Sequence, residues 1–442
     1  MLIEFKVSNF LSFKEEIRFS LASSSLKDKK VSDESVLFHP YDNDKFTLLK
    51  SAAVYGANAS GKSNLVKAMI FFKKFILSSS TSTQIEEPID VVNFKLSTES
   101  EKESSVFDII FLSQNRQFRY GFSVNPLRVD AEWLYMKDLK PKAREKEIFF
   151  RTYDGYEVND IFQIGKDLVE KKMVRSNALL LSTAAQFNEP IATEIFHWLS
   201  TFNLVSWNRD GQYSPYTAWK LQDPVAKARI LDFTKFADLG IDDIQLVQEA
   251  GLETKLKGTN PQSELALTKL LVERNNNSLF SFHQKFDKDL NEKELVQFLF
   301  SQSESEGTMK YFGLAGPIID TLDNGKILVI DELDSKLHPL LTQKIISLFN
   351  SRETNPKNAQ LVFTTHDTNL LSAHIFRRDQ IWFTQKDRYG ASTLYSLAEY
   401  IVPVRNDASF EKDYLAGKYG AVPSFKNFKK LFNSKTVLNN GK

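Results

Sequence analysis

A glycine-rich run, GANASGKS at residues 56–63, constrains the fold of this chain more than any other feature. It matches the pattern G-x-x-x-x-G-K-[ST] without a mismatch, which chance would produce in on the order of one chain in a hundred of this length. The apolar stretch FTLLKSAAVYG (46–56) leads into it, and apolar residues at helical spacing follow it: Leu65, Ala68, Met69, Phe72 and Ile76. The order strand, loop, helix is the context that a phosphate-binding loop requires.

The residue types in this run suit phosphate. Glycines let the backbone approach phosphate oxygens, and successive amides together with the helix N-terminus supply positive potential. We expect Lys62 to reach the β- and γ-phosphates and Ser63 to ligate Mg²⁺. The predicted nucleotide-binding residues here are Gly56, Ala57, Asn58, Ala59, Ser60, Gly61, Lys62, Ser63 and Asn64. A glycine-rich turn without a ligand is the alternative, and the flanking strand and helix argue against it.

A second segment, KILVIDELDS, supplies the carboxylates that a phosphate loop lacks. Its apolar residues 327–330 predict a short buried strand that ends in Asp331 and Glu332, at the end of a strand where α/β sheets place their ligands. We expect Asp331 to hold Mg²⁺ through its water shell and Glu332 to act as the general base for the attacking water. A surface turn after a core strand would look the same in isolation, but Lys62 and Ser63 in the same chain favour the catalytic reading.

A third apolar strand, in LVFTTHD (361–367), ends at His366, which is expected to contact the γ-phosphate. His338 also stands close to the acids, but Pro339 suits the first position of a helix, so His338 is assigned to that turn. The paired acids followed by a histidine argue against a kinase. Because the sequence contains no Asn-Lys-x-Asp guanine-reading motif, ATP is the expected nucleotide.

The segment ESEGTMKYFGLAGPIID (304–320) carries a hydroxyl and a glycine just before a helical pattern. Ser305, Gly307 and the helix N-terminus could converge on an anion, although in isolation the segment is only a capped helix. Gly316-Pro317 predicts that this helix kinks or ends early.

In this order the elements resemble the ATP-binding-cassette (ABC) ATPases of the SMC/RecF-like branch. IEFKVSNFLSFKEEIRF (3–19) is similar to the opening strands of that branch, and SEGT (305–308) to a divergent form of its signature motif. Over nearly the whole chain the resemblance is closer to abortive-infection ATP-binding proteins of the AAA type. It rests on RSNALLLSTAAQFN (175–188), RRDQIWFTQKD (377–387) and YLAGKYGAVP (414–423).

The expected fold is α/β: a P-loop sheet of the ABC and SMC-head type, with N-terminal antiparallel strands and an inserted, mostly helical region. We expect an N-terminal lobe with the phosphate loop over 1–185, the helical insertion over 186–300 and a C-terminal lobe over 301–442. Hairpins are predicted in SVFDIIFLSQNRQFRYGFSV and DQIWFTQKDRYGASTLYSL, and helices in QSELALTKLLVERNNN and NEKELVQFLF.

The resemblance also implies a composite site. ATP would lie between the phosphate loop of one copy and the signature of another, so Ser305 and Gly307 would serve the partner's ATP, with Asp334 at that interface. Relatives of this kind are associated with phage defence, beside an effector such as a nuclease with a Toprim-like fold. The expected function is therefore an ATPase switch that controls an effector encoded nearby.

Two other functions compete with this one. A DNA-repair ATPase of the RecF type would use the same heads as a clamp. A self-contained nuclease would need an added acidic cluster, and the residues after His366 contain no convincing Asp-x-Asp group.

Composition limits the partners. Lys and Arg total 57 and Asp and Glu 56, so the chain has no global basic field, and nucleic acid would need a local patch. The basic, Phe-containing segment PSFKNFKKLFNSK (423–435) could dock a partner or touch nucleic acid, but such a segment is more often a surface helix that rests its apolar side on the core. There is no cysteine, no apolar presequence and no apolar run near the roughly 20 residues of a membrane span, so a cytoplasmic protein without a membrane contact is expected.

Overall fold

The computed structural model describes residues 1–26, 36–40, 46–82, 84–140, 142–206, 213–237, 239–246, 279–400 and 409–423. The helix predicted in QSELALTKLLVERNNN and nearly all of the basic C-terminal segment lie outside the described residues. Within the described part of the chain, no helix is both long and apolar enough to cross a bilayer.

A six-stranded sheet forms the centre of the nucleotide-binding half, in the order β11-β15-β16-β5-β17-β18. All its pairings are parallel except that of β17 with β18. Its strands are β11 (Phe202–Ser206), β15 (Ile327–Asp331), β16 (Gln360–Thr364), β5 (Ser51–Gly56), β17 (Ile381–Lys386) and β18 (Ser392–Ser396). β5, β15 and β16 are buried along their whole length, as parallel strands covered on both faces are.

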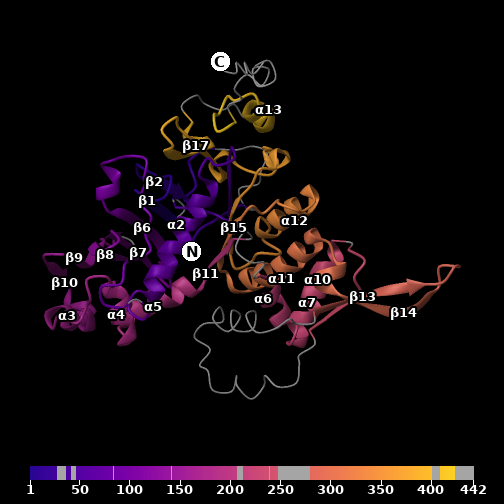
Figure 1. Ribbon diagram of the computed structural model, residues 1–442, viewed down its shortest axis with the longest axis horizontal. Coiled ribbons are helices and arrows are strands. Elements are labelled where there is room, and N and C mark those ends of the chain that lie inside the picture. Colours follow the sequence, from indigo (N-terminus) through magenta and orange to yellow (C-terminus); the bar gives the residue numbers. More distant parts are fainter. Residues whose placement is uncertain are drawn as a thin grey trace, which may run out of the picture.

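A seven-stranded antiparallel sheet lies beside it, in the order β10-β9-β8-β7-β6-β1-β2 (Figure 1). Its strands are β1 (Leu2–Ser8), β2 (Ile17–Ser20), β6 (Ser105–Ser113), β7 (Arg116–Val124), β8 (Val129–Asp138), β9 (Lys146–Thr152) and β10 (Tyr156–Val158). The predicted N-terminal strands and both predicted hairpins, β6–β7 and β17–β18, are confirmed.

Helix α2 (Lys62–Ser78) packs between the two sheets. Its predicted apolar face is buried, and Phe72 contacts the rings of Phe5 and Phe122 in the antiparallel sheet. The same core contains Val54 and Val329 of the parallel sheet. The helix that begins at the phosphate loop is therefore clamped by apolar contacts on both sides, which fixes where its N-terminus points.

The opposite face of the parallel sheet is covered by α11 (Glu306–Asn324) and α12 (Pro339–Phe349). Strand residues alternate between the two cores: Val329 belongs to the α2 side, whereas Leu328 and Ile330 pack on the α11 and α12 side. His338 is the N-cap of α12 and Pro339 its first residue, which confirms the sequence assignment.

Of the two outcomes predicted for Gly316-Pro317, a kink or an early end of α11, the early end is wrong, since the helix continues to Asn324. Proline has no N–H, so the carbonyl of Gly313 loses its usual donor. Thr217 on α6 (Tyr213–Lys220) replaces it: its hydroxyl donates to the Gly313 oxygen at 2.8 Å and accepts from the Gly316 N–H at 3.1 Å. A hydroxyl from a neighbouring helix thus keeps the helix continuous.

Replacing Thr217 by valine is expected to lower the free energy of unfolding by about 1–3 kcal/mol, because two buried backbone groups of α11 lose their partner. Urea unfolding measures this. Thr321→Val is the matched control: Thr321 is a buried threonine on α11 whose hydroxyl has no partner within the described residues. Equal losses in the two variants would contradict the account.

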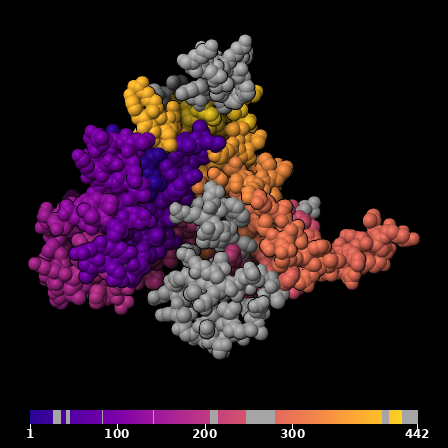
Figure 2. Space-filling view, viewed as in Figure 1, coloured from indigo at the N-terminus to yellow at the C-terminus, as the bar shows by residue number. Residues whose placement is uncertain are grey.

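The region 186–300, expected to be mostly helical, is mixed where it is described. It contains α5 (Pro190–Ser200), α6, α7 (Pro224–Phe236) and the last residue of α4 (Leu180–Gln186), but also β11 of the parallel sheet and a separate antiparallel sheet of three strands. These three strands are β12 (Asp243–Leu246), β13 (Leu279–Phe286) and β14 (Glu292–Leu299), and β13–β14 projects from the body (Figures 1 and 2).

The helix predicted in NEKELVQFLF is therefore wrong, because these residues form β14 and the start of α10. Periodicity alone separates short strands from helices poorly. The Asp287 side chain accepts from the Asn291 N–H at 3.0 Å, which closes the turn that pairs β13 with β14. The remaining elements are α3 (Gln163–Glu170), α4 (Leu180–Gln186), α10 (Phe300–Ser303), α13 (Phe410–Leu415), β3 (Leu37–Phe38) and β4 (Leu48–Leu49).

Candidate nucleotide site

The phosphate loop connects the end of β5 to the start of α2, and its glycines are there for steric reasons. Gly56 has φ +154° and Gly61 φ +119°. A Cβ on Gly56 would lie 2.4 Å from the Thr384 hydroxyl oxygen, and a Cβ on Gly61 would lie 2.7 Å from the Ser392 hydroxyl oxygen. Only glycine fits where the loop runs this close to β17 and β18.

Lys62 is buried beneath this loop. Its Nζ donates to the carbonyl oxygens of Gly56 at 2.8 Å and Ala57 at 3.1 Å, so the loop wraps around the ammonium group. Burial lowers the pKa of Lys62 to about 8, while the charges of Asp331 and Glu332 act in the opposite direction. A cation held at the base of the loop favours phosphate, and the acidic groups nearby suit a divalent cation.

The rest of the loop is divided between anchored and open residues. The Ser60 and Thr384 hydroxyls lie 2.6 Å apart, and the Asn64 side chain donates to the Ser12 hydroxyl at 2.7 Å. Asn58 and Ala59 are exposed, and Ala59 has φ +61°. The tip of the loop therefore faces solvent while its base is tied to neighbouring strands.

The structure brings Ser63 and Asp331 together, as the sequence predicts. Asp331, at the end of β15, is 4% exposed, and its Oδ1 accepts from the Ser63 hydroxyl at 3.1 Å. The same oxygen accepts from the Thr364 hydroxyl at 2.7 Å. The carboxyl ends of β15 and β16 and the first turn of α2 thus meet at one point.

Glu332 follows with an uncommon backbone conformation, at φ +54°. Its N–H donates to the Thr364 hydroxyl at 2.7 Å, and its carbonyl accepts from Lys310 Nζ at 2.6 Å. The side chain is partly buried. The two peptide groups that flank the Glu332 Cα are therefore each held by a hydrogen bond.

His366 and Asp334 are joined through the backbone. The His366 N–H donates to Asp334 Oδ2 at 3.2 Å, and Asp334 Oδ1 is buried without a hydrogen-bond partner in the described part of the chain. Partial desolvation and the nearby charge of Lys62 lower the pKa of His366. His366 is thus within electrostatic range of Lys62 and is favoured in its neutral form.

Ser305 and Gly307 are placed differently from the other predicted residues. Ser305 is the exposed N-cap of α11, and its hydroxyl accepts from the Thr308 N–H at 3.1 Å. A Cβ on Gly307 would lie 2.6 Å from the Lys336 carbonyl oxygen, so glycine is needed where α11 meets the loop after Glu332. Among the hydrogen bonds of the described residues, none joins Ser305 or Gly307 to residues 56–64.

Three residues that contact the predicted site residues are not predicted from the sequence. Thr364 bonds to Asp331 and Glu332, Thr384 meets the phosphate loop, and Lys310 holds the carbonyl of Glu332. A threonine that ends an otherwise apolar central strand is a signal for Thr364, because polar groups there face the ligand edge of the sheet. No local sequence pattern identifies Thr384 or Lys310, because each contacts its partners in the site only in the folded chain.

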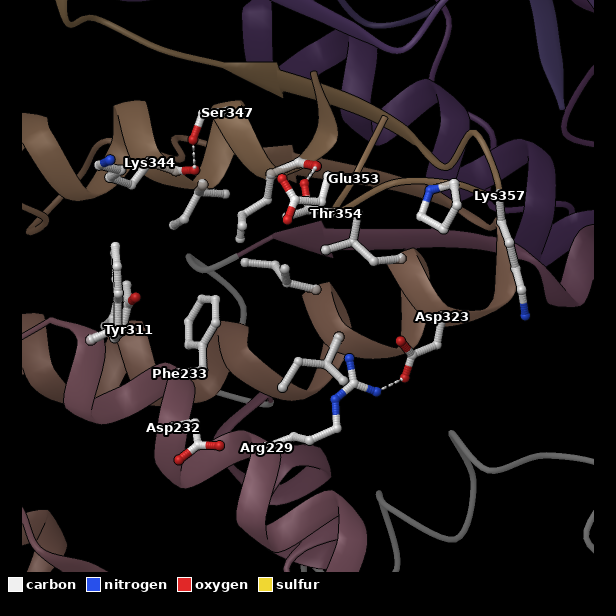
Figure 3. A pocket seen from close by; sticks show the side chains of 17 residues that line it. Arg229, Asp232, Phe233, Tyr311, Asp323, Lys344, Ser347, Glu353, Thr354 and Lys357 are labelled. Carbon is white, nitrogen blue, oxygen red and sulfur yellow. Dashed lines mark hydrogen bonds and ion pairs between the residues drawn. The ribbon is translucent and has the colours of Figure 1, made fainter. Parts of the chain in front are cut away.

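A groove of about 820 Å³ lies elsewhere, between α7, α11 and α12 (Figure 3). Phe233 and Tyr311 stack in its apolar floor, and Arg229 pairs with Asp323 at its rim. None of the predicted site residues lines it. The predicted nucleotide-binding residues therefore lie outside this groove.

The residues present fit a magnesium nucleotide. Ser63 and Asp331 offer hard oxygen donors, and Mg²⁺ in such sites takes one or two protein ligands and completes its shell with water and phosphate. The described residues contain no group of three or more His, Asp or Glu that would hold a metal on its own.

A parallel sheet with this phosphate loop and these carboxylates at its ligand edge defines the class of P-loop ATPases. The chain belongs to the family described as "AAA domain, putative AbiEii toxin, Type IV TA system", whose model matches residues 51–372, well over half of the chain. The matched range begins at β5 and extends past His366, so it includes the phosphate loop and both acids.

Comparison with solved structures finds SMC and RecF heads. The SMC head domain from Thermotoga maritima is 14% identical, with a TM-score of 0.35 over 89% of this chain and 98% of that chain. The recombination mediator protein RecF with ATPrS, of the RecFOR pathway, is 13% identical, with a TM-score of 0.32 over 90% of this chain and 98% of that chain. No curated protein matches the chain.

Proposed function

We propose that this chain is an ABC-type ATPase switch, in which ATP held by one copy is covered by the α11 N-terminus of a second copy. One observation carries the proposal. Each chain assembles the phosphate loop with Asp331, whereas its exposed Ser305 makes no hydrogen bond to that loop. An N-cap hydroxyl and free helix N–H groups suit an anion, and here they are available to another molecule.

The residues of one chain then have distinct roles. The backbone of 56–64 holds the phosphates, Lys62 contacts the β- and γ-phosphates, and His366 contacts the γ-phosphate. Ser63 and Asp331 would hold Mg²⁺, which when bound neutralises charge on the phosphate oxygens.

Hydrolysis needs a base next to the γ-phosphate. The Glu332 carboxylate takes a proton from the attacking water, the water oxygen bonds to the γ-phosphorus, and the bond to the β–γ bridging oxygen breaks to leave ADP and phosphate. Closure of two copies precedes this step, and hydrolysis reopens them.

We further propose that this cycle controls a separate effector in an anti-phage abortive-infection system. The family description, with its toxin and toxin–antitoxin terms, supports that setting. The near-zero net charge supports a switch rather than a DNA clamp, because a clamp relies on a basic surface. A nuclease, for example one with a Toprim-like fold, is the proposed effector.

Mixing two inactive variants tests the composite site. Lys62→Ala removes the cation that contacts the phosphates in a chain's own site. Ser305→Arg prevents the α11 N-terminus from covering the ATP of the other copy. Each variant alone is therefore expected to lose ATP hydrolysis. Heterodimers regain one intact site, so an equimolar mixture should recover activity, at most about a quarter of the wild-type rate per chain. Absence of recovery at every mixing ratio would refute the shared site.

Ser301→Arg is the matched control, because Ser301 is also an exposed serine, on neighbouring α10. It should leave hydrolysis unchanged. The role in defence is tested separately, by pull-down of the product of the adjacent reading frame with and without ATP. An ATP-dependent complex with a nuclease supports the switch, whereas a recombination or replication protein in its place contradicts it.

A further inference from the structure

A buried lysine links the N-terminal part of α11 to the loop that contains Glu332. Lys310 is fully buried, and its Nζ donates to three oxygens of that loop: the Glu332 carbonyl at 2.6 Å, the Ser335 carbonyl at 2.8 Å and the Ser335 hydroxyl at 3.1 Å. Burying an ammonium group is costly unless it is fully bonded. This arrangement therefore serves to fix the loop in one conformation.

The loop needs such support at Glu332. A left-handed backbone is uncommon for a residue with a long side chain, and it persists only where the surroundings hold it. Thr364 holds the N–H of Glu332 from the sheet, and Lys310 holds its carbonyl from α11. If the second of these bonds is lost, the peptide after Glu332 can rotate, and the carboxylate moves with it.

The same helix meets the loop at a second point. Gly307 packs so closely on Lys336 that a Cβ would lie 2.6 Å from the Lys336 carbonyl oxygen, and the Lys336 side chain pairs with Glu306 at 2.8 Å. The first two turns of α11 and residues 332–336 are therefore joined at two points, which gives a displacement at Ser305 a path to Glu332.

We propose that Lys310 is a positioning residue that couples the exposed N-terminus of α11 to the Glu332 carboxylate. This inference rests on the proposed function, in which Ser305 touches the nucleotide of a second copy while Glu332 acts on the nucleotide of its own chain. Through Lys310, occupancy of one site sets the geometry of the base in the other. The two sites of a dimer are thereby coupled.

The test compares Lys310→Met with Lys73→Met in the full-length chain. Lys73, on α2, is a partly buried lysine whose Nζ donates to the Phe202 carbonyl oxygen at 2.6 Å. Burial lowers the pKa of both lysines to about 8, so the two substitutions remove comparable groups. Steady-state ATP hydrolysis and thermal unfolding are measured for each.

Lys310→Met is expected to lower kcat roughly tenfold to a hundredfold, as misplacement of a catalytic group by about 1 Å does, with KM for Mg-ATP within about threefold of wild type. Lys73→Met should keep kcat within about twofold at temperatures where it is folded. If Lys310→Met does not fold, Lys310→Arg is measured in its place, and a lower kcat at unchanged KM is again expected. A folded Lys310 variant with wild-type kcat overturns the inference, as does an equal loss in Lys73→Met.

Glu332→Gln, measured in parallel, separates this inference from the proposed function. If Glu332→Gln turns over ATP normally, the assignment of the base has failed. If Glu332→Gln is inactive while Lys310→Met is fully active, only the role of Lys310 has failed.

Discussion

Lys62→Ala is expected to raise the Kd for Mg-ATP by about tenfold to a hundredfold or more, and to abolish ATP hydrolysis. A hydrogen bond to a charged group contributes about 1.5–3 kcal/mol, which corresponds to a change in Kd of this size. Lys62 is the cation at the base of the phosphate loop, so its loss removes such a bond to the phosphates. The substitution also leaves the carbonyls of Gly56 and Ala57 without their shared donor, so the loop loses its internal support. Isothermal titration with a slowly hydrolysed ATP analogue measures the loss.

Lys67→Ala is the control for this experiment. Lys67 also lies on α2, but its side chain is exposed and points away from the buried face of the helix. Its substitution should leave the Kd unchanged. Wild-type affinity in folded Lys62→Ala would show that nucleotide does not occupy the phosphate loop.

Glu332→Gln is expected to lower kcat by about 10²- to 10⁴-fold while Mg-ATP binding is preserved. Glutamine has nearly the same shape but cannot take a proton from water, and general-base catalysis contributes rate factors of this order. The backbone at φ +54° places the same demand on both residues, so the fold should be unaffected. Phosphate release under saturating Mg-ATP measures kcat.

The matched control is Glu353→Gln, at an exposed glutamate in the loop after α12. It removes the same charge from the surface and should turn over at the wild-type rate. Normal turnover by Glu332→Gln, with binding intact, would assign the base to another group.

The sequence predicts those parts of the fold that local patterns determine. The phosphate loop is flanked by β5 and α2 as expected, because an apolar run, glycines and a helical repeat follow one another directly. The apolar residues 327–330 predict β15 and the place of Asp331 for the same reason. Residues that share one edge of a parallel sheet are brought together by the topology, so the contact of Ser63 with Asp331 follows as well.

Other features depend on residues far apart in the chain. α11 continues past Pro317 because Thr217, which lies 96 residues before Gly313 in the chain, donates the hydrogen bond that the proline cannot. The support of Glu332 by Lys310 likewise depends on how α11 packs against the loop. The sequence predicts a helix at β14 because a short apolar run fits the helical and the strand repeat equally well. The segment is a strand because it pairs with β13.

The most direct test of the central claim, that ATP joins two copies of this chain, is the molar mass of Glu332→Gln in solution. Light scattering after gel filtration should give at least twice the 50.7 kDa of one chain in Mg-ATP, and a lower mass in Mg-ADP. Adding Ser305→Arg to the same chain should prevent the increase. An identical mass with Mg-ATP, with Mg-ADP and without nucleotide, in a protein that demonstrably binds ATP, would contradict the account.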